Sequence, residues 1–145
     1  MMLHEEAHVA LAAKSTAERQ LAQAAACPTW RHAAFALLMA ALVATTALPL
    51  ALRVGALVLI LIGVGLIVQS DRRRTGVFVN GYRRGKTRIV TFAMLAAVLP
   101  LYALSARAAL AGDTLTPLLL AVATFVVSLA FSVIWQRVFV RELGA

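Results

Sequence analysis

The chain has 145 residues, enough for one domain, and 62% of them are hydrophobic, with a mean hydropathy of +0.88. This apolar share is well above the roughly 45–50% of a soluble domain, so the composition excludes a water-soluble fold and indicates a membrane protein. The formal charge is +8, and basic residues gather at the ends of apolar segments. That distribution suits anionic lipid headgroups and disfavours binding to nucleic acid.

Residues 1–30 are predicted to form a cytoplasmic helical segment, because they are rich in alanine, leucine, glutamate, lysine and glutamine. The sequence HEEAH at 4–8 matches the H-E-x-x-H pattern, in which two histidines one helical turn apart bind zinc. No third ligand follows in a recognised pattern, so a solvated helix face is favoured. His4, Glu5 and His8 form a weak candidate metal site, and a membrane-associated zinc protease is the least favoured function.

The remaining residues, 31–145, are predicted to form an all-α membrane domain, a bundle of four transmembrane helices in two antiparallel hairpins. Each predicted span is free of Asp, Glu, Lys, Arg and His. At about 1.5 Å per residue, each is long enough, or nearly so, to cross a hydrocarbon core of about 30 Å. Pro49 is placed in the last turn of the first span. The spans cover about residues 33–52, 54–69, 89–106 and 115–135.

A basic cytoplasmic loop, residues 70–88, is predicted between the second and third spans, and it holds seven of the fourteen basic residues. With this loop in the cytoplasm, four spans place both termini there as well. Twelve basic residues then lie inside, against Arg53 and Arg107 outside. Such an asymmetry follows the positive-inside rule, so we expect a multi-pass protein of the inner (cytoplasmic) membrane with both termini cytoplasmic.

The loop carries more than charge, because Asn80-Gly81 is a strong tight-turn dipeptide between aromatic residues. The stretch at 81–87 is one residue too short for a P-loop and no strand precedes it, so neither a nucleotide nor any other cofactor is expected. We expect the loop to bind anionic headgroups or a protein partner. The candidate residues are Arg72, Arg73, Arg74, Phe78, Asn80, Gly81, Tyr82, Arg83, Arg84, Lys86 and Arg88.

Small and hydroxyl-bearing residues inside the spans are predicted to form helix contacts, because they let backbones approach closely in a bilayer. They are Gly55, Gly63, Thr124, Ser128 and Ser132. The two hairpins also resemble each other: RHAAFALL at 31–38 matches RIVTFAML at 88–95, and Leu-Pro-Leu follows in both. Duplication of a two-helix unit and chance similarity both remain open.

These features favour a non-enzymatic accessory, regulatory or scaffold subunit that acts through its basic loop, as an oligomer or with a protein partner. The alternative is a small oligomeric transporter or channel subunit, for which the hydroxyl stripe of the fourth span provides a polar path. Spans without ionisable residues disfavour proton-coupled pumps.

Overall fold

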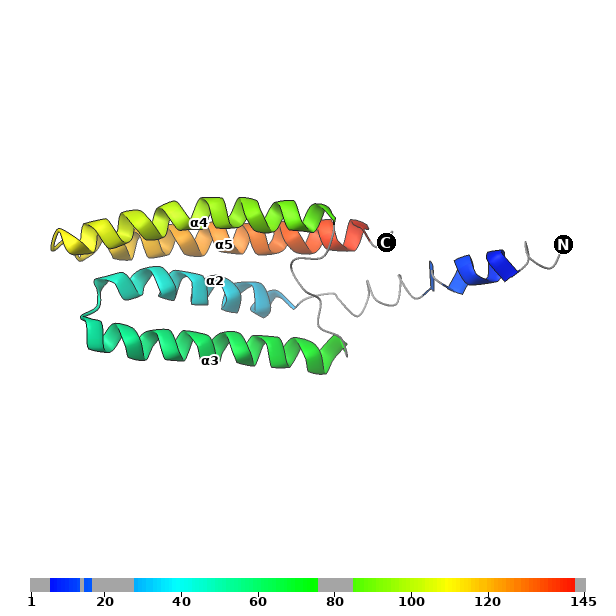
Figure 1. The fold of residues 1–145 in the computed structure, drawn as a ribbon, viewed down its shortest axis with the longest axis horizontal. Helices are drawn as coiled ribbons and strands as arrows, with labels where there is room; N and C mark the ends of the chain where they lie inside the picture. Colours follow the sequence, from blue (N-terminus) through cyan, green and yellow to red (C-terminus); the bar gives the residue numbers. More distant parts are fainter. Residues whose placement is uncertain (1–5, 14, 17–27, 76–84, 143–145) are drawn as a thin grey trace.

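The structure is a computed structural model, and it describes residues 6–13, 15–16, 28–75 and 85–142. All the regular structure in these ranges is helical, and four of the helices are long and apolar enough to span a membrane. They lie side by side as one bundle (Figure 1). This confirms the prediction of an all-α fold with four helices able to span a membrane. A further helical stretch covers residues 6–13 near the N-terminus.

The first apolar segment is shorter than predicted and ends before Pro49. It consists of α2, Thr29–Ala44, and the short 3-10 helix η1, Thr45–Ala47, after which α3 covers Leu50–Thr75. Proline has no N–H and disfavours a helical residue before it, so it interrupts a helix but suits a helix start. Pro49 therefore precedes α3 instead of lying in the last turn of the first span, and its carbonyl accepts the N–H of Arg53 at 2.9 Å.

The other two helices are α4, Lys86–Leu110, and α5, Leu115–Glu142. At 25 and 28 residues they are about 38 and 42 Å long, more than a hydrocarbon core of about 30 Å. Both therefore extend beyond the predicted spans. Likewise α3 continues through part of the predicted loop, because the three arginines at 72–74 are good helix formers.

The core lies among α2, α4 and α5, where the fully buried side chains are small or hydroxyl-bearing, with the exception of a few larger apolar residues such as Val43 and Phe139. In contrast, α3 packs mainly along α2, and no residue of its most apolar stretch is buried. Gly63 is at this contact, since a Cβ there would lie 2.8 Å from a methyl group of Leu38. Gly55 makes no comparable contact, because a Cβ there would have no neighbour within 4 Å.

The two helix pairs differ in shape although their sequences resemble each other. Leu-Pro-Leu at 48–50 forms the break between η1 and α3, whereas Pro100 of the matching run at 99–101 lies inside α4. As a result α4 continues where α2 stops, and the connection between α4 and α5 projects beyond the turn between η1 and α3 (Figure 1).

Near that turn, a buried pair of hydroxyl groups joins η1 to α4. Thr46 Oγ1 and Ser105 Oγ are 2.6 Å apart, and Ser105 Oγ also lies 3.3 Å from the carbonyl oxygen of Val43. The Thr46 hydroxyl donates within its own turn to the same carbonyl at 2.9 Å. The pair therefore fixes the end of the first apolar segment against α4.

Replacing Ser105 with Ala is expected to destabilise the bundle by about 0.6 kcal/mol, the average measured for interhelical hydrogen bonds in a membrane protein. The measurement is the unfolding free energy in mixed detergent micelles, with Ser70→Ala as a control at an α3 position away from this pair. A double-mutant cycle with Thr46→Val should show coupling between the two hydroxyls. Strictly additive losses would contradict the assigned contact.

Candidate functional site

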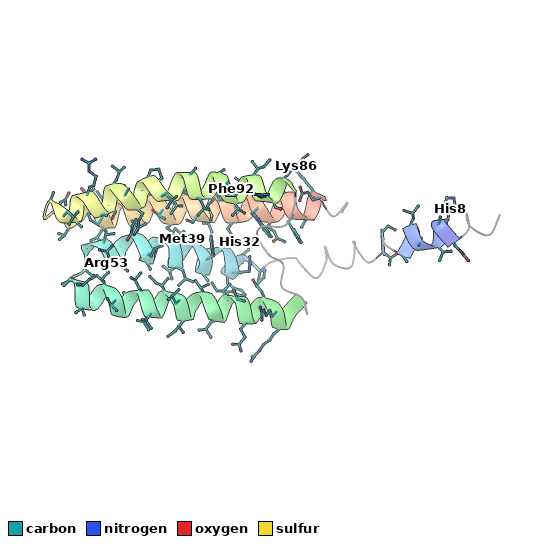
Figure 2. The ribbon with its side chains drawn as sticks, viewed as in Figure 1. His8, His32, Met39, Arg53, Lys86 and Phe92 are labelled. Carbon is teal, nitrogen blue, oxygen red and sulfur yellow. The ribbon has the colours of Figure 1, made fainter. Side chains whose placement is uncertain are left out.

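Positive charge is concentrated at one end of the bundle, which we call the basic end: the end where α2 and α4 begin and α3 and α5 finish. In the described part of the chain, the opposite end carries only the basic residues Arg53 and Arg107. Lys86 and Arg53 mark the two ends in Figure 2. The basic end has Arg31, Arg72, Arg73, Arg74, Lys86, Arg88, Arg137 and Arg141.

The residues predicted to bind headgroups or a partner fall into two groups. Arg72 and Arg73 are exposed near the end of α3, and Lys86 and Arg88 are exposed in the first turn of α4. The Arg88 guanidinium lies 5.4 Å from the centre of the Phe92 ring. Arg74 belongs to the last turn of α3. The other candidates lie outside the described residues: Phe78, Asn80, Gly81, Tyr82, Arg83 and Arg84.

Of the three proposed metal ligands, only His8 lies within the described residues. His8 is exposed on its helix (Figure 2), while His4 and Glu5 lie outside the described residues. Among the described residues, no three His, Cys, Asp or Glu side chains are grouped closely enough to hold a metal ion. The zinc hypothesis therefore remains a prediction from the sequence pattern.

An ion pair between α2 and α3 is the main polar contact that the sequence analysis missed. Arg31 Nε donates to both carboxylate oxygens of Asp71, at 2.9 and 2.8 Å, and Nη2 lies 2.7 Å from Oδ2. Both side chains are partly exposed, at 24% and 22%. Two nitrogens of one guanidinium on one carboxylate give a directional, charge-assisted contact. It joins the first turn of α2 to the end of α3.

His32, the next residue, belongs to α2 and is buried, so ionisable residues do occur within the membrane helices. Its Nδ1 shares a hydrogen bond of 2.7 Å with the Ser132 hydroxyl of α5. The predicted first span began at residue 33 and excluded both Arg31 and His32. The helix starts one turn earlier, after Pro28, and that turn supplies the polar contacts of the basic end.

A cavity of about 240 Å³ lies beside these contacts, near the basic end. Side chains of three helices, α2, α4 and α5, line it, and it is partly open. Its lining is mostly aromatic and aliphatic, with one guanidinium and two hydroxyl groups. The lining residues are Arg31, Phe35, Val90, Thr91, Met94, Phe131, Ser132 and Trp135. Trp135 is held in place by Phe139, whose ring stacks on it at 5.2 Å.

The hydroxyl stripe predicted on the fourth span is directed to the inside of the bundle. Thr124 donates to the Leu120 carbonyl of its own helix at 2.8 Å, and Ser132 contacts His32. Ser128 is fully buried, and its hydroxyl has no partner within the described residues. These hydroxyl groups face other helices of the same chain. That position fits a role in helix packing better than a role in a polar path through the membrane.

Comparison with known proteins gives no further assignment: no protein-family model matches the chain, and neither a curated protein nor a solved structure matches it significantly. The site is therefore described by its own geometry.

At the opposite end, Asp113 caps α5. Its Oδ1 accepts the N–H groups of Leu115 and Thr116 at 2.9 and 3.2 Å, and the Thr116 hydroxyl donates to Oδ2. Hydrogen bonding from the Thr116 side chain, and then from the Thr116 and Leu115 backbone, lowers the pKa of the Asp113 carboxyl below its ordinary value. The charged carboxylate also suits the positive end of the helix dipole.

This lowered pKa predicts an acid-dependent loss of stability. The stabilisation from Asp113 is fully present above the pKa of an unfolded aspartate, about 3.9, and is lost as the pH falls through the lower folded pKa. Asp113→Ser keeps a capping oxygen but no titrating group. We expect the melting temperatures of the two proteins to differ less at pH 3 than at pH 6. A constant difference over this range would show that the cap does not depend on ionisation.

Proposed function

We propose that the protein is a non-enzymatic scaffold subunit of the inner membrane. Its basic end lies at the cytoplasmic leaflet, and α3 pairs with α3 of a second copy of the chain. Exposed basic side chains at that end, such as Arg72, Arg73, Lys86 and Arg88, suit anionic headgroups and an acidic partner surface. The proposal places both termini in the cytoplasm and treats each pair of consecutive helices as a hairpin. It also explains why one helix is scarcely packed.

The observation that carries the proposal is the outward face of α3. The positions Gly55, Ile62 and Gln69 recur every seven residues, as do Val58 and Gly65, and all five are exposed. A seven-residue repeat of this kind keeps one seam facing a parallel partner helix. Gly55 and Gly65 leave room for close approach, because a Cβ at either position would have no neighbour within 4 Å.

A second copy fits this face better than an unrelated helix. In a symmetric dimer about the membrane normal, the two α3 helices run parallel and present the same seam to each other. Gln69 then meets Gln69 of the other copy, and a single polar residue in such a seam specifies register. The Gln69 amide has both hydrogen-bond donors and an acceptor, so the amides of the two copies can hydrogen-bond to each other. This arrangement leaves the basic ends of both copies on the same side of the membrane.

The orientation is tested by cysteine labelling in a Cys27→Ser background. Leu110→Cys marks the opposite end, where the side chain is exposed, and Arg141→Cys marks the basic end. In intact cells an impermeant maleimide is expected to label the first variant, and to label the second only after the cytoplasmic face is opened. The reverse pattern would reject the proposed topology, because it would place the positive charge outside.

The association is tested by energy transfer between donor- and acceptor-labelled chains, diluted stepwise in lipid vesicles. Gly65→Phe adds bulk where the single chain has open space, so the chain should fold while the dimer constant falls at least about tenfold. Gln69→Ala should weaken the dimer about threefold, the equivalent of one interhelical hydrogen bond of about 0.6 kcal/mol.

Val122→Phe is the matched control, because Val122 is exposed on α5 and lies off the α3 seam. It should leave the dimer constant unchanged. Chains that stay monomeric at every dilution would reject self-association and direct attention to a different partner. An equal loss for Gly65→Phe and Val122→Phe would show that bulk anywhere on the surface weakens the contact, and would reject the α3 seam.

A further inference from the structure

The cavity near the basic end, which is partly open to the surroundings, combines two kinds of chemistry in one space. Its apolar part comes from all three surrounding helices: Phe35 of α2, Val90 and Met94 of α4, and Phe131 and Trp135 of α5. Its polar part is the Arg31 guanidinium with the hydroxyls of Thr91 and Ser132. An apolar lining with a few converging polar groups is the usual composition of a small-molecule site. A ligand for this site must therefore have a long apolar part and a compact polar one.

The size of the cavity further limits the kinds of ligand that it can hold. Its volume of about 240 Å³ is below the lower end, about 300 Å³, of typical pockets for drug-sized molecules. It therefore has room for part of one acyl chain, but not for two chains side by side. Trp135 lines the cavity near the end of α5, and tryptophan favours the level where hydrocarbon meets headgroups. An acyl chain that enters the cavity beside Trp135 comes directly from the surrounding lipid.

The charge of the ligand follows from Arg31. A guanidinium binds carboxylates and phosphates through parallel N–H donors, and the structure shows Arg31 holding one carboxylate in this way, that of Asp71. We infer that the cavity binds a single-chain anionic amphiphile, whose acyl chain packs among the aromatic side chains and whose carboxylate or phosphate replaces Asp71 on Arg31. Asp71 is then an internal competitor for the ligand.

This exchange couples the cavity to α3. Asp71 belongs to α3, so a ligand headgroup on Arg31 removes the ion pair that ties the end of α3 to α2. By reciprocity, a change to Asp71 that weakens its hold on Arg31, and leaves Arg31 in place, strengthens the binding of the anionic amphiphile. The inference rests on the proposed placement of the basic end at headgroup level, but it does not depend on pairing through α3.

Trp135 provides a direct readout. The chain has two tryptophans, so Trp30→Phe leaves Trp135 as the only one. The protein is placed in nanodiscs of zwitterionic phosphatidylcholine and titrated with dibrominated stearoyl chains, which quench tryptophan on contact. Three probes are used: the free fatty acid, the lysophosphatidylglycerol and the lysophosphatidylcholine. The first two carry a net negative charge and separate a carboxylate source from a phosphate source, while the third is the zwitterionic control.

Saturable quenching by at least one anionic probe, and only a gradual linear loss with the zwitterionic one, is the expected result. Arg31→Gln and Asp71→Asn break the same ion pair, so a purely structural effect moves both variants in the same direction. We expect opposite effects: Arg31→Gln should weaken binding about tenfold, and Asp71→Asn should tighten it severalfold, because each changes one charge-assisted contact. Arg137→Gln removes an exposed charge at the basic end, outside the cavity lining, and should change binding little.

Three results would overturn the inference. Linear quenching by all three probes would show that Trp135 meets bulk lipid and that the cavity holds no ligand. Equal weakening by Arg31→Gln and Arg137→Gln would assign the effect to general surface attraction. Weaker or unchanged binding in Asp71→Asn would show that Asp71 is not a competitor. The labelling experiment on membrane orientation is independent of all three, so failure of the ligand site and failure of the topology are distinguishable.

Discussion

A leucine-rich helix gains little free energy by exchanging lipid contacts for contacts with another helix, so a membrane bundle depends on close backbone approach and on interhelical polar contacts. The core of α2, α4 and α5 has both. Its most buried positions include Ala36, Thr124 and Ser128, and polar contacts from η1 and α2 reach α4 and α5. The position of α3 follows from the same constraint, because its close approach at Gly63 and the Arg31–Asp71 pair are its main links to α2.

The ion pair and the cavity belong to one piece of structure. Arg31 contributes to both, and Ser132 contributes to the cavity while it bonds to His32. The proposed topology places these groups where the helices leave the hydrocarbon, a level at which charges are tolerated and local fields are stronger than in water. The first turn of α2 is therefore the place where the packing of α3, the contact with α5 and the proposed ligand site are interdependent.

The sequence was sufficient to predict the helical class, the four membrane helices and the asymmetry of charge, because each depends on runs of residue types. The helix ends were less predictable. The ability of arginine to continue α3 and the break at Leu48–Pro49 depend on where water begins and on local backbone geometry. The Arg31–Asp71 pair follows from matching residues at the two ends of adjacent helices, a signal present in the sequence but not used.

The cavity was beyond sequence reasoning, since it depends on the rotation of three helices about their axes. Phe35 and Phe92 illustrate this, because they occupy matching places in the two similar runs: Phe35 lines the cavity, whereas Phe92 is exposed beside Arg88. Hydropathy patterns do not determine such a difference, because lipid and protein interior are equally apolar.

The unequal reach of the two helix pairs has a consequence for the surrounding lipid. The tip between α4 and α5 projects beyond the turn between η1 and α3 (Figure 1), so the helices reach further along the bundle on one side than on the other. Bilayers adapt to helices of unequal length by thickening or thinning, at a cost of a fraction of a kcal/mol per Å. We therefore expect the thickness of the bilayer to differ between the two sides of the bundle. Such a difference in thickness favours particular orientations of the protein relative to its neighbours in the membrane. It also favours membranes whose thickness matches the helices.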